Sequence, residues 1–118
     1  MKNFKELKIW QKGLLVAINS FKITKDFPRE EKFGLASQIN RAAVSIPSNI
    51  AEDSSRSSGK EYNHFFEISL GSCFEMETQL LISRALNYGD QKLISSVLDL
   101  LTEEEKMLSA FSASLRKK

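Results

Sequence analysis

The 118-residue chain has few of the residues that build small extracellular or β-rich domains. It contains one cysteine, Cys73, so it cannot form an internal disulfide, and nothing indicates an oxidising compartment. Two prolines and five glycines supply few turn residues for a β-protein of this size. The chain is long enough for one core and too short for two. We therefore predict an all-α fold with a single domain over residues 1–118.

Long apolar runs are also absent. No stretch approaches the roughly 18 to 20 consecutive apolar residues of a membrane-spanning helix. The N-terminal sequence Met-Lys-Asn-Phe-Lys-Glu has no adjoining apolar signal core. We therefore expect a cytoplasmic protein with no membrane partner.

Catalytic and cofactor-binding motifs are scarce. Glu61 and His64 match the Glu-x-x-His spacing of carboxylate-bridged dimetal bundles, but His64 is the only histidine and the motif occurs once. Cys73 falls on an apolar helix face, where a buried thiol is more common than a nucleophile. No glycine-rich phosphate loop is present. The sequence therefore predicts no cofactor, no metal and no catalytic residues, and a protein that is not an enzyme.

Apolar residues that recur at spacings of three and four predict long helices through most of the chain. These helices span approximately residues 4–23, 28–52, 59–86 and 91–116. Asn3 and Glu6 form a capping-box pattern at the first helix, and Asp90 can cap the last. Short connections between helices of this length favour antiparallel neighbours, so we predict an up-down-up-down antiparallel four-helix bundle.

Two core predictions are specific enough to test. On a helical wheel the first helix has one broad apolar face, opposite Lys5, Lys8 and Lys12. The residues predicted to fill the core from this face are Leu7, Trp10, Leu14, Ala17, Ile18 and Phe21. In the last helix Glu104 falls within the apolar stripe, so it needs either an arginine partner or a path to solvent.

Three helices carry apolar residues beyond the stripe that a monomeric bundle needs. Such second stripes indicate self-association, although helices that bury broad arcs within one subunit would explain them equally. The residues assigned to this hypothetical oligomer interface are Ile9, Val16, Ala36, Val44, Pro47, Ala51, Leu70, Phe74 and Leu81.

Polar residues recur along one side of the second and third predicted helices. Half-buried polar groups in a helical assembly must pair with one another, so we interpret this seam as a structural network and not a catalytic cluster. We expect its central contact to join Arg41 to Glu75. The predicted members are Gln38, Arg41, Ser45, Ser48, Asn49, Glu52, Ser72, Glu75 and Gln79.

Charge is unevenly distributed, although the net charge is only +2. Residues 1–41 carry nine Lys or Arg against four Asp or Glu, whereas residues 42–115 carry five against eleven. Lysines on a helix face are usually simply solvated, but repeated around an oligomer they could grip a nucleic-acid backbone without reading its sequence. The candidate nucleic-acid-binding residues are Lys5, Lys8, Lys12, Lys22, Lys25, Arg29 and Lys32, with Arg116, Lys117 and Lys118 at the C-terminus.

Several segments resemble the bacterial four-helix-bundle family of ribosomal RNA intervening-sequence proteins. The most specific is Ser45-Ile-Pro-Ser-Asn-Ile-Ala-Glu52, and the chain departs from the family at Asp53, where glycine is typical. The other segments that carry the resemblance are Phe4-x-x-Leu7-x-x-Trp10-Gln11, Phe27-Pro28, Phe33-Gly-Leu-Ala-Ser-Gln38, Arg41-Ala-Ala-Val44 and Gly71-Ser-Cys-Phe-Glu75-Met-Glu77.

The resemblance implies a homo-oligomer, with pentameric rings expected, and no established enzymatic activity. The chain is also similar to the accessory bundle protein of diversity-generating retroelements, which implies a reverse transcriptase and nucleic acid as partners. We therefore expect a non-enzymatic oligomer that binds RNA or DNA through its basic surface. The alternative is a protein-interaction scaffold or adaptor without a nucleic-acid role.

Overall fold

The computed structural model describes residues 3–55 and 59–116, with only the backbone described for residues 59–63 and 115–116. The described residues form four long helices and no strand, which confirms the predicted all-α class. Two short 3-10 turns, η1 at Phe4–Glu6 and η2 at Arg29–Glu31, precede the first and second helices. The long helices are α1 at Lys8–Thr24, α2 at Leu35–Ser54, α3 at Gly59–Ala85 and α4 at Gln91–Arg116.

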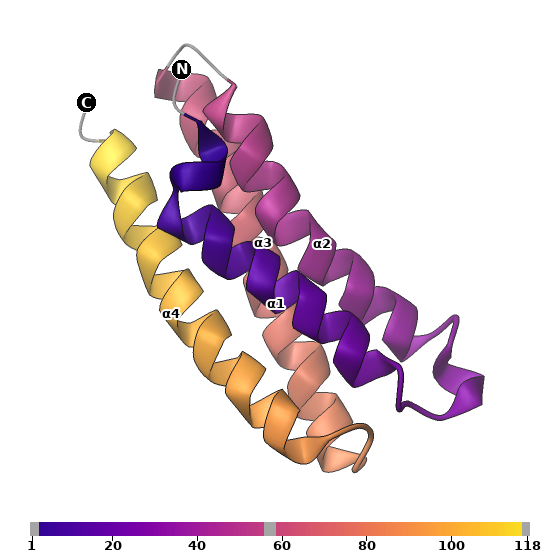
Figure 1. Ribbon diagram of the computed structural model, residues 1–118. Coiled ribbons are helices and arrows are strands. Elements are labelled where there is room, and N and C mark those ends of the chain that lie inside the picture. The colour runs from indigo at the N-terminus through magenta and orange to yellow at the C-terminus, as the bar shows by residue number, and fades with distance from the viewer. Residues whose placement is uncertain (1–2, 56–58, 117–118) are drawn as a thin grey trace.

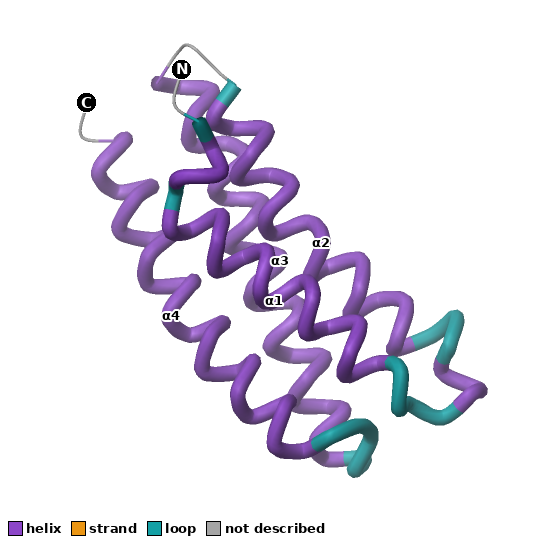
Figure 2. Tube along the Cα trace, viewed as in Figure 1, coloured by secondary structure: helices purple, strands orange, loops and turns teal. Residues whose placement is uncertain are grey.

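The four helices run antiparallel to their chain neighbours in one elongated bundle (Figure 1). They contact one another in a closed ring, α1 with α2, α2 with α3, α3 with α4 and α4 with α1. The bundle measures 46 × 21 × 20 Å. Loops are confined to its two ends, and the α1–α2 and α3–α4 connections lie at the same end (Figure 2). This is the predicted up-down-up-down topology.

Buried positions in each helix follow alternate spacings of three and four residues, as in coiled-coil seams. In α3, for example, Phe66, Ser69, Cys73, Met76 and Leu80 are buried in this register. The same spacing in α4 buries an apolar series that Glu104 interrupts. The largest fully buried apolar side chains are Ile23, Ile39, Ile46, Ile50, Phe66, Met76, Leu80, Ile94, Leu101 and Leu108.

The prediction of which α1 residues face the core was partly wrong. Leu14, Ile18 and Phe21 are 38%, 48% and 52% exposed. A neighbouring face, which includes small residues, is buried instead, because Gly13 and Ser20 allow α1 to approach the other helices closely. The buried residues of α1 are Ile9, Gly13, Val16, Ala17, Ser20 and Ile23. Leu7 and Trp10 are partly buried against the core, as the prediction required.

Helix boundaries differ from the predicted ones at the first two helices. Asn3 does cap a helical turn, but its Oδ1 accepts a hydrogen bond from Lys5 N–H at 3.1 Å within η1, and α1 begins only at Lys8. The second helix begins at Leu35, since Phe27-Pro28 and η2 form a separate connection. Its end extends past Glu52 to Ser54, so Asp53 belongs to the last turn and not to the loop.

The final helix begins as predicted. Asp90 Oδ1 accepts hydrogen bonds from the backbone N–H groups of Lys92 and Leu93, at 3.0 and 3.1 Å. The turn before it contains Asn87 with φ 60° and Gly89 with φ 77°, both in the left-handed region that closes helix ends. None of the helices has, within its described residues, an apolar stretch long enough to cross a membrane.

Candidate nucleic-acid interface

The basic residues predicted to form one surface divide into two groups at opposite ends of α1. Lys5, Lys8 and Lys12 lie in η1 and the first half of α1, whereas the other four lie at or beyond its C-terminal end. Lys8 and Lys25 are about 25 Å apart along the axis of α1, because an α-helix rises about 1.5 Å per residue. This distance exceeds the Debye length of about 8 Å at physiological ionic strength, so the two groups act separately.

The first group is partly neutralised. Lys12 Nζ donates to Glu103 Oε1 of α4 at 2.9 Å, and the lysine side chain is mostly buried in that contact. Lys5 lies over the ring of Phe4, with 6.0 Å between Nζ and the ring centroid. Lys8 and Lys12 also border a shallow groove between α1 and α4 that Met107 shares. Within the described residues Lys12 is therefore paired with a carboxylate, while Lys5 and Lys8 stay exposed.

The second group surrounds a cavity of about 490 Å³ between the end of α1 and the start of α2. Among the described residues three cations line it, Lys25, Arg29 and Lys32, and all are exposed. Lys22 is also exposed at the end of α1, but it does not line the cavity. The remaining lining residues are Phe21, Thr24, Phe27, Pro28, Ala36 and Asn40. We name this feature the basic cavity.

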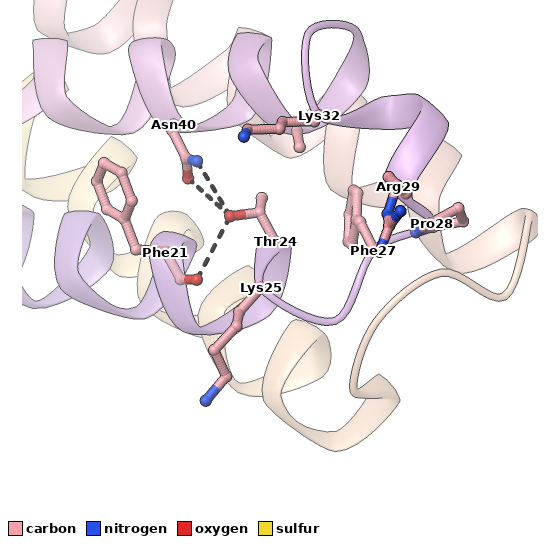
Figure 3. A pocket seen from close by; sticks show the side chains of 9 residues that line it. Phe21, Thr24, Lys25, Phe27, Pro28, Arg29, Lys32 and Asn40 are labelled. Atoms are coloured by element: carbon pink, nitrogen blue, oxygen red, sulfur yellow. Dashed lines mark hydrogen bonds between the residues drawn. The ribbon is translucent and has the colours of Figure 1, made fainter.

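A hydrogen-bonded pair fixes the floor of the basic cavity. Asn40 Nδ2 donates to Thr24 Oγ1 at 3.0 Å, and Figure 3 shows the two side chains facing each other between α2 and α1. Ser20, which is fully buried, donates from Oγ to Asn40 Oδ1 at 3.1 Å. These bonds link the two helices and hold the Asn40 amide at a set position.

Two phenylalanines flank this floor from opposite sides (Figure 3). Phe21 is 52% exposed. Phe27 packs against Tyr88 with ring centroids 5.5 Å apart. Its Cε1 would lie 2.9 Å from a Cβ atom at Gly89, so a side chain at that glycine would displace the ring. The turn after α3 therefore holds Phe27 in position.

No Asp or Glu belongs to the described lining of the basic cavity, although acidic residues are close in the sequence. Glu31 accepts a hydrogen bond from Leu35 N–H at 3.1 Å through Oε1. Its Oε2 accepts a bond from Tyr88 Oη at 3.5 Å. Glu31 therefore caps the start of α2, which has no capping side chain at Gly34. The cations consequently dominate the cavity wall.

Sequence reasoning identified the cations but missed the other half of this cavity. Phe21 was assigned to the core, and Asn40 was not singled out. The signal lies in the spacing of Phe21, Thr24, Lys25 and Pro28, which are three, four and seven residues apart along one helical face and its continuation. An aromatic ring, a hydroxyl and a cation on one helical face indicate a surface that can stack, hydrogen-bond and attract anions.

The predicted polar network forms in part. Ser72 Oγ donates to Ser45 Oγ at 2.9 Å across the α2–α3 contact, and Asn49 Nδ2 donates to the same oxygen at 2.8 Å. Arg41 and Glu75 do not form an ion pair. Glu75 Oε2 instead accepts a bond from Gln79 Nε2 at 3.1 Å, within its own helix. Gln38, Arg41 and Ser48 are exposed, because they lie on the outer side of α2.

The residues predicted for an oligomer interface divide by burial. Ile9, Val16, Ala36 and Pro47 are buried within the subunit, so this part of the prediction was wrong. Their helices bury broader arcs than one stripe, since α1 and α2 approach closely at Gly13 and Pro47. Ala51 and Leu70 are partly buried. Val44, Phe74 and Leu81 are 43%, 51% and 41% exposed and remain available for contacts between subunits.

Glu104 is fully buried, with neither the arginine partner nor the path to solvent that its position called for. Neither of its carboxyl oxygens has a hydrogen-bond partner among the described residues. Burial raises the pKa of Glu104 from 4.5 to about 8, and the charge of Lys12 partly opposes this shift. The carboxyl group is therefore largely protonated in the folded protein at neutral pH.

Two further titratable groups lie between α3 and α4. Cys73 is buried, and its pKa is raised far above the ordinary range, first by burial and then by the charges of Glu104, Glu105 and Glu77. Burial, a hydrogen bond with Glu77 and the charge of Glu77 raise the pKa of Glu105. A thiol in these surroundings is a poor nucleophile, since only the thiolate reacts.

Metal-binding geometry is not found in the described part of the chain. No group of three or more His, Cys, Asp or Glu side chains there could hold a metal ion. His64 is exposed and contacts the ring of Phe65 at 5.1 Å between centroids. The side chain of Glu61, its partner in the Glu-x-x-His pattern, lies outside the described residues.

Comparison with known proteins identifies the family. The family model described as "23S rRNA-intervening sequence protein" matches residues 5–110. A solved structure from Bacteroides thetaiotaomicron, described as a protein with unknown function from the S23 ribosomal protein family, matches with a TM-score of 0.81 and 25% sequence identity. The match covers 89% of this chain and 95% of that one. No curated protein matched. Neither description names an enzymatic activity, and the chain belongs to the 23S rRNA-intervening sequence protein family.

Proposed function

We propose that this chain is a non-enzymatic, homo-oligomeric bundle protein that binds the phosphate backbone of RNA through the basic cavity. The observation that carries the proposal is that Lys25, Arg29 and Lys32 line one cavity whose described lining has no carboxylate. Lysine and arginine neutralise phosphates and release their counterions, which gives affinity without sequence specificity. The family description, which refers to ribosomal RNA, makes RNA the first ligand to test.

Oligomerisation is the second part of the proposal. Val44 on α2 and Phe74 and Leu81 on α3 are large apolar side chains with over two fifths of their surface exposed. Burying them against a second copy would remove apolar surface from water, at about 25 cal/mol per Å². The resemblance noted above favours a ring of five. In such a ring the basic cavity would be repeated on each subunit, and several weak phosphate contacts would add up through multivalency.

The test of RNA binding compares two variants with the same loss of charge. In the first, Lys25, Arg29 and Lys32 are each replaced by glutamine. In the control, glutamine replaces three exposed cations far from the basic cavity, Lys5, Lys8 and Lys106. Fluorescence anisotropy with labelled RNA at low ionic strength should show a loss of affinity of at least tenfold for the first variant and a smaller loss for the control. Equal losses, or no RNA binding by the parent protein, would refute the proposal.

The alternative function is a protein-interaction scaffold. It is favoured by exposed apolar residues on α1 that the core does not use, namely Leu14, Leu15 and Ile18. A scaffold would capture a protein partner from host lysate after nuclease treatment and lose it when Leu15 and Ile18 are replaced by glutamate. Capture of ribosomal RNA alone, with no protein that depends on these residues, would count against the scaffold.

A further inference from the structure

The basic cavity joins three kinds of surface. Aromatic rings form two of its walls, a polar pair forms its floor, and cations form its rim. Its volume of about 490 Å³ falls within the range of roughly 300 to 1,000 Å³ that small-molecule sites occupy. A surface that only gripped phosphates would need the cations alone. The rings and the amide therefore call for a ligand with an aromatic, hydrogen-bonding part.

We propose that the basic cavity accepts one unpaired nucleotide, with its base stacked on Phe21 and its phosphate held by cations that line the cavity. This inference rests on the proposed function and specifies which form of RNA is bound. A base in a duplex is paired and stacked, so its face cannot reach a side chain without being flipped out. The proposal therefore requires preference for single strands, loops or free ends.

Phe21 offers an open ring at the edge of the cavity. Its exposure of 52% means that much of the ring contacts no other side chain in the described structure. Phe27 is less exposed, because Tyr88 and the turn at Gly89 support it from behind. Figure 3 shows the Thr24–Asn40 pair between the two rings, so the open ring of Phe21 is the stacking surface for a base. Stacking of bases on aromatic side chains tolerates every base, in keeping with binding that is not sequence-specific.

The floor supplies the hydrogen bond that a base edge needs. An asparagine amide nitrogen carries two N–H donors, and Asn40 uses one of them on Thr24 Oγ1. Its Oδ1 lies 3.1 Å from Ser20 Oγ and 3.2 Å from Thr24 Oγ1, and these contacts hold the amide group in place. The second N–H is left for an acceptor in the cavity. Each of the four bases has at least one such acceptor, either a carbonyl oxygen or an unprotonated ring nitrogen.

The cations determine where the phosphate lies. Lys32 is held near Phe33, with 5.5 Å from Nζ to the ring centroid, and its amine points toward the side of the cavity where Asn40 lies (Figure 3). Arg29 stands at the opposite end of the cavity, near Phe27 in the same view. Cations at two places along the cavity can contact the phosphates that precede and follow one base. This spacing favours a strand that passes across the cavity.

The experiment uses three ligands: a single-stranded RNA decamer that contains one 2-aminopurine, the same decamer in a duplex, and the free mononucleotide. Each is measured with the parent protein, with Phe21→Ala, with Phe21→Trp and with the control Leu14→Ala, which removes an exposed apolar residue of α1 outside the cavity. Circular dichroism verifies that each variant is folded, as expected for changes at exposed positions.

We expect Phe21→Ala to weaken single-strand binding by about tenfold, since base stacking contributes that much or more. It should leave duplex binding within twofold, while Phe21→Trp restores the affinity and Leu14→Ala changes nothing. 2-Aminopurine fluorescence should be quenched on binding of the single strand. RNA that binds equally well as strand and duplex, without any effect of Phe21→Ala, would overturn the nucleotide site and leave backbone binding intact.

Binding of the free mononucleotide distinguishes the proposed nucleotide site from the proposed RNA-binding function. If it binds in a manner that depends on Phe21 while neither RNA binds, the cavity is a nucleotide site and the proposed RNA-binding function is wrong. If none of the three ligands binds, both proposals are refuted.

Discussion

A Cβ atom on Gly13 of α1 would lie 3.0 Å from Oε2 of Glu104 on α4. The same atom would lie 3.1 Å from Cγ2 of Ile46 and 3.5 Å from the backbone nitrogen of Pro47, both on α2. Gly13 therefore marks a point where three helices meet, and the buried carboxyl group of Glu104 occupies the space that a side chain would need. Gly13 leaves room for the buried carboxyl group of Glu104, so a larger residue at position 13 would collide with it.

Gly13→Ala should destabilise the protein despite the better helix propensity of alanine. The propensity gain is about 1 kcal/mol, whereas overpacking of a tight core costs about 1 to 3 kcal/mol. The matched control is Gly71→Ala, since a Cβ there would meet nothing within 4 Å. Urea unfolding should show the first variant less stable than the parent and the second slightly more stable. A gain in stability for both variants would contradict the close packing at Gly13.

Glu104→Gln should make stability less dependent on pH. The pKa of Glu104 is raised to about 8 in the folded state, so between pH 4.5 and 8 the unfolded chain releases this proton while the folded chain retains it. The stability contribution is therefore complete at acidic pH and is lost as the pH rises toward 8. Each tenfold change in proton affinity corresponds to ~1.4 kcal/mol, so relative to the parent the variant should gain on the order of 4 kcal/mol at pH 8 and little at pH 4.5.

Thermal melts of the parent and Glu104→Gln across this pH range measure the effect. Asp99→Asn provides the control, because Asp99 is an exposed acidic residue on the same helix. The control should follow the pH profile of the parent. If Glu104→Gln also follows it, the buried carboxyl group does not hold a proton in the folded state.

Cys73 should resist thiol reagents as long as the bundle is folded. Its burial and the raised pKa of its thiol leave almost no accessible thiolate at pH 8. Labelling with a chromogenic disulfide reagent should be slow in buffer and reach one thiol per chain in denaturant. Rapid labelling of the native protein would show that the contact between α3 and α4 opens readily.

Phe74→Glu should lower the oligomeric state and leave helical content unchanged, because Phe74 is half exposed and makes little contribution to the core. Val44→Glu should act in the same way. Thr102→Glu, which introduces the same charge at an exposed position of α4, is the control and should leave the assembly intact. Light scattering measures the mass directly. A parent protein that is monomeric at all concentrations would remove the basis for this prediction.

Periodicity was enough to predict the fold class, the topology and most of α3 and α4. It failed on the orientation of α1, because the buried face of that helix includes Gly13 and Ser20, which do not count as apolar in a hydrophobic pattern. The buried series Ile9, Gly13, Val16, Ser20 and Ile23 has spacings of four and three, the register that the other helices also use. Counting glycine and serine as possible core residues would have revealed it.

The candidate site was less predictable than the fold, because it depends on which residues of two helices and a connection meet in space. Sequence alone identified Lys25, Arg29 and Lys32 as part of a long basic set. It could not show that they share one cavity with Phe21 and Asn40 while Lys12 is paired with Glu103 on another helix. Contacts between residues more than fifteen positions apart, such as Thr24 with Asn40, require the folded structure.

The salt dependence of RNA binding is the most direct test of the proposed function. Each phosphate neutralised on a single strand contributes about 0.7 to the slope of log affinity against log salt concentration. We predict that replacement of Lys25, Arg29 and Lys32 by glutamine lowers the magnitude of this slope by about 2, whereas the change at Lys5, Lys8 and Lys106 lowers it by much less. Identical slopes for the parent protein and the first variant would contradict binding of the RNA backbone at the basic cavity.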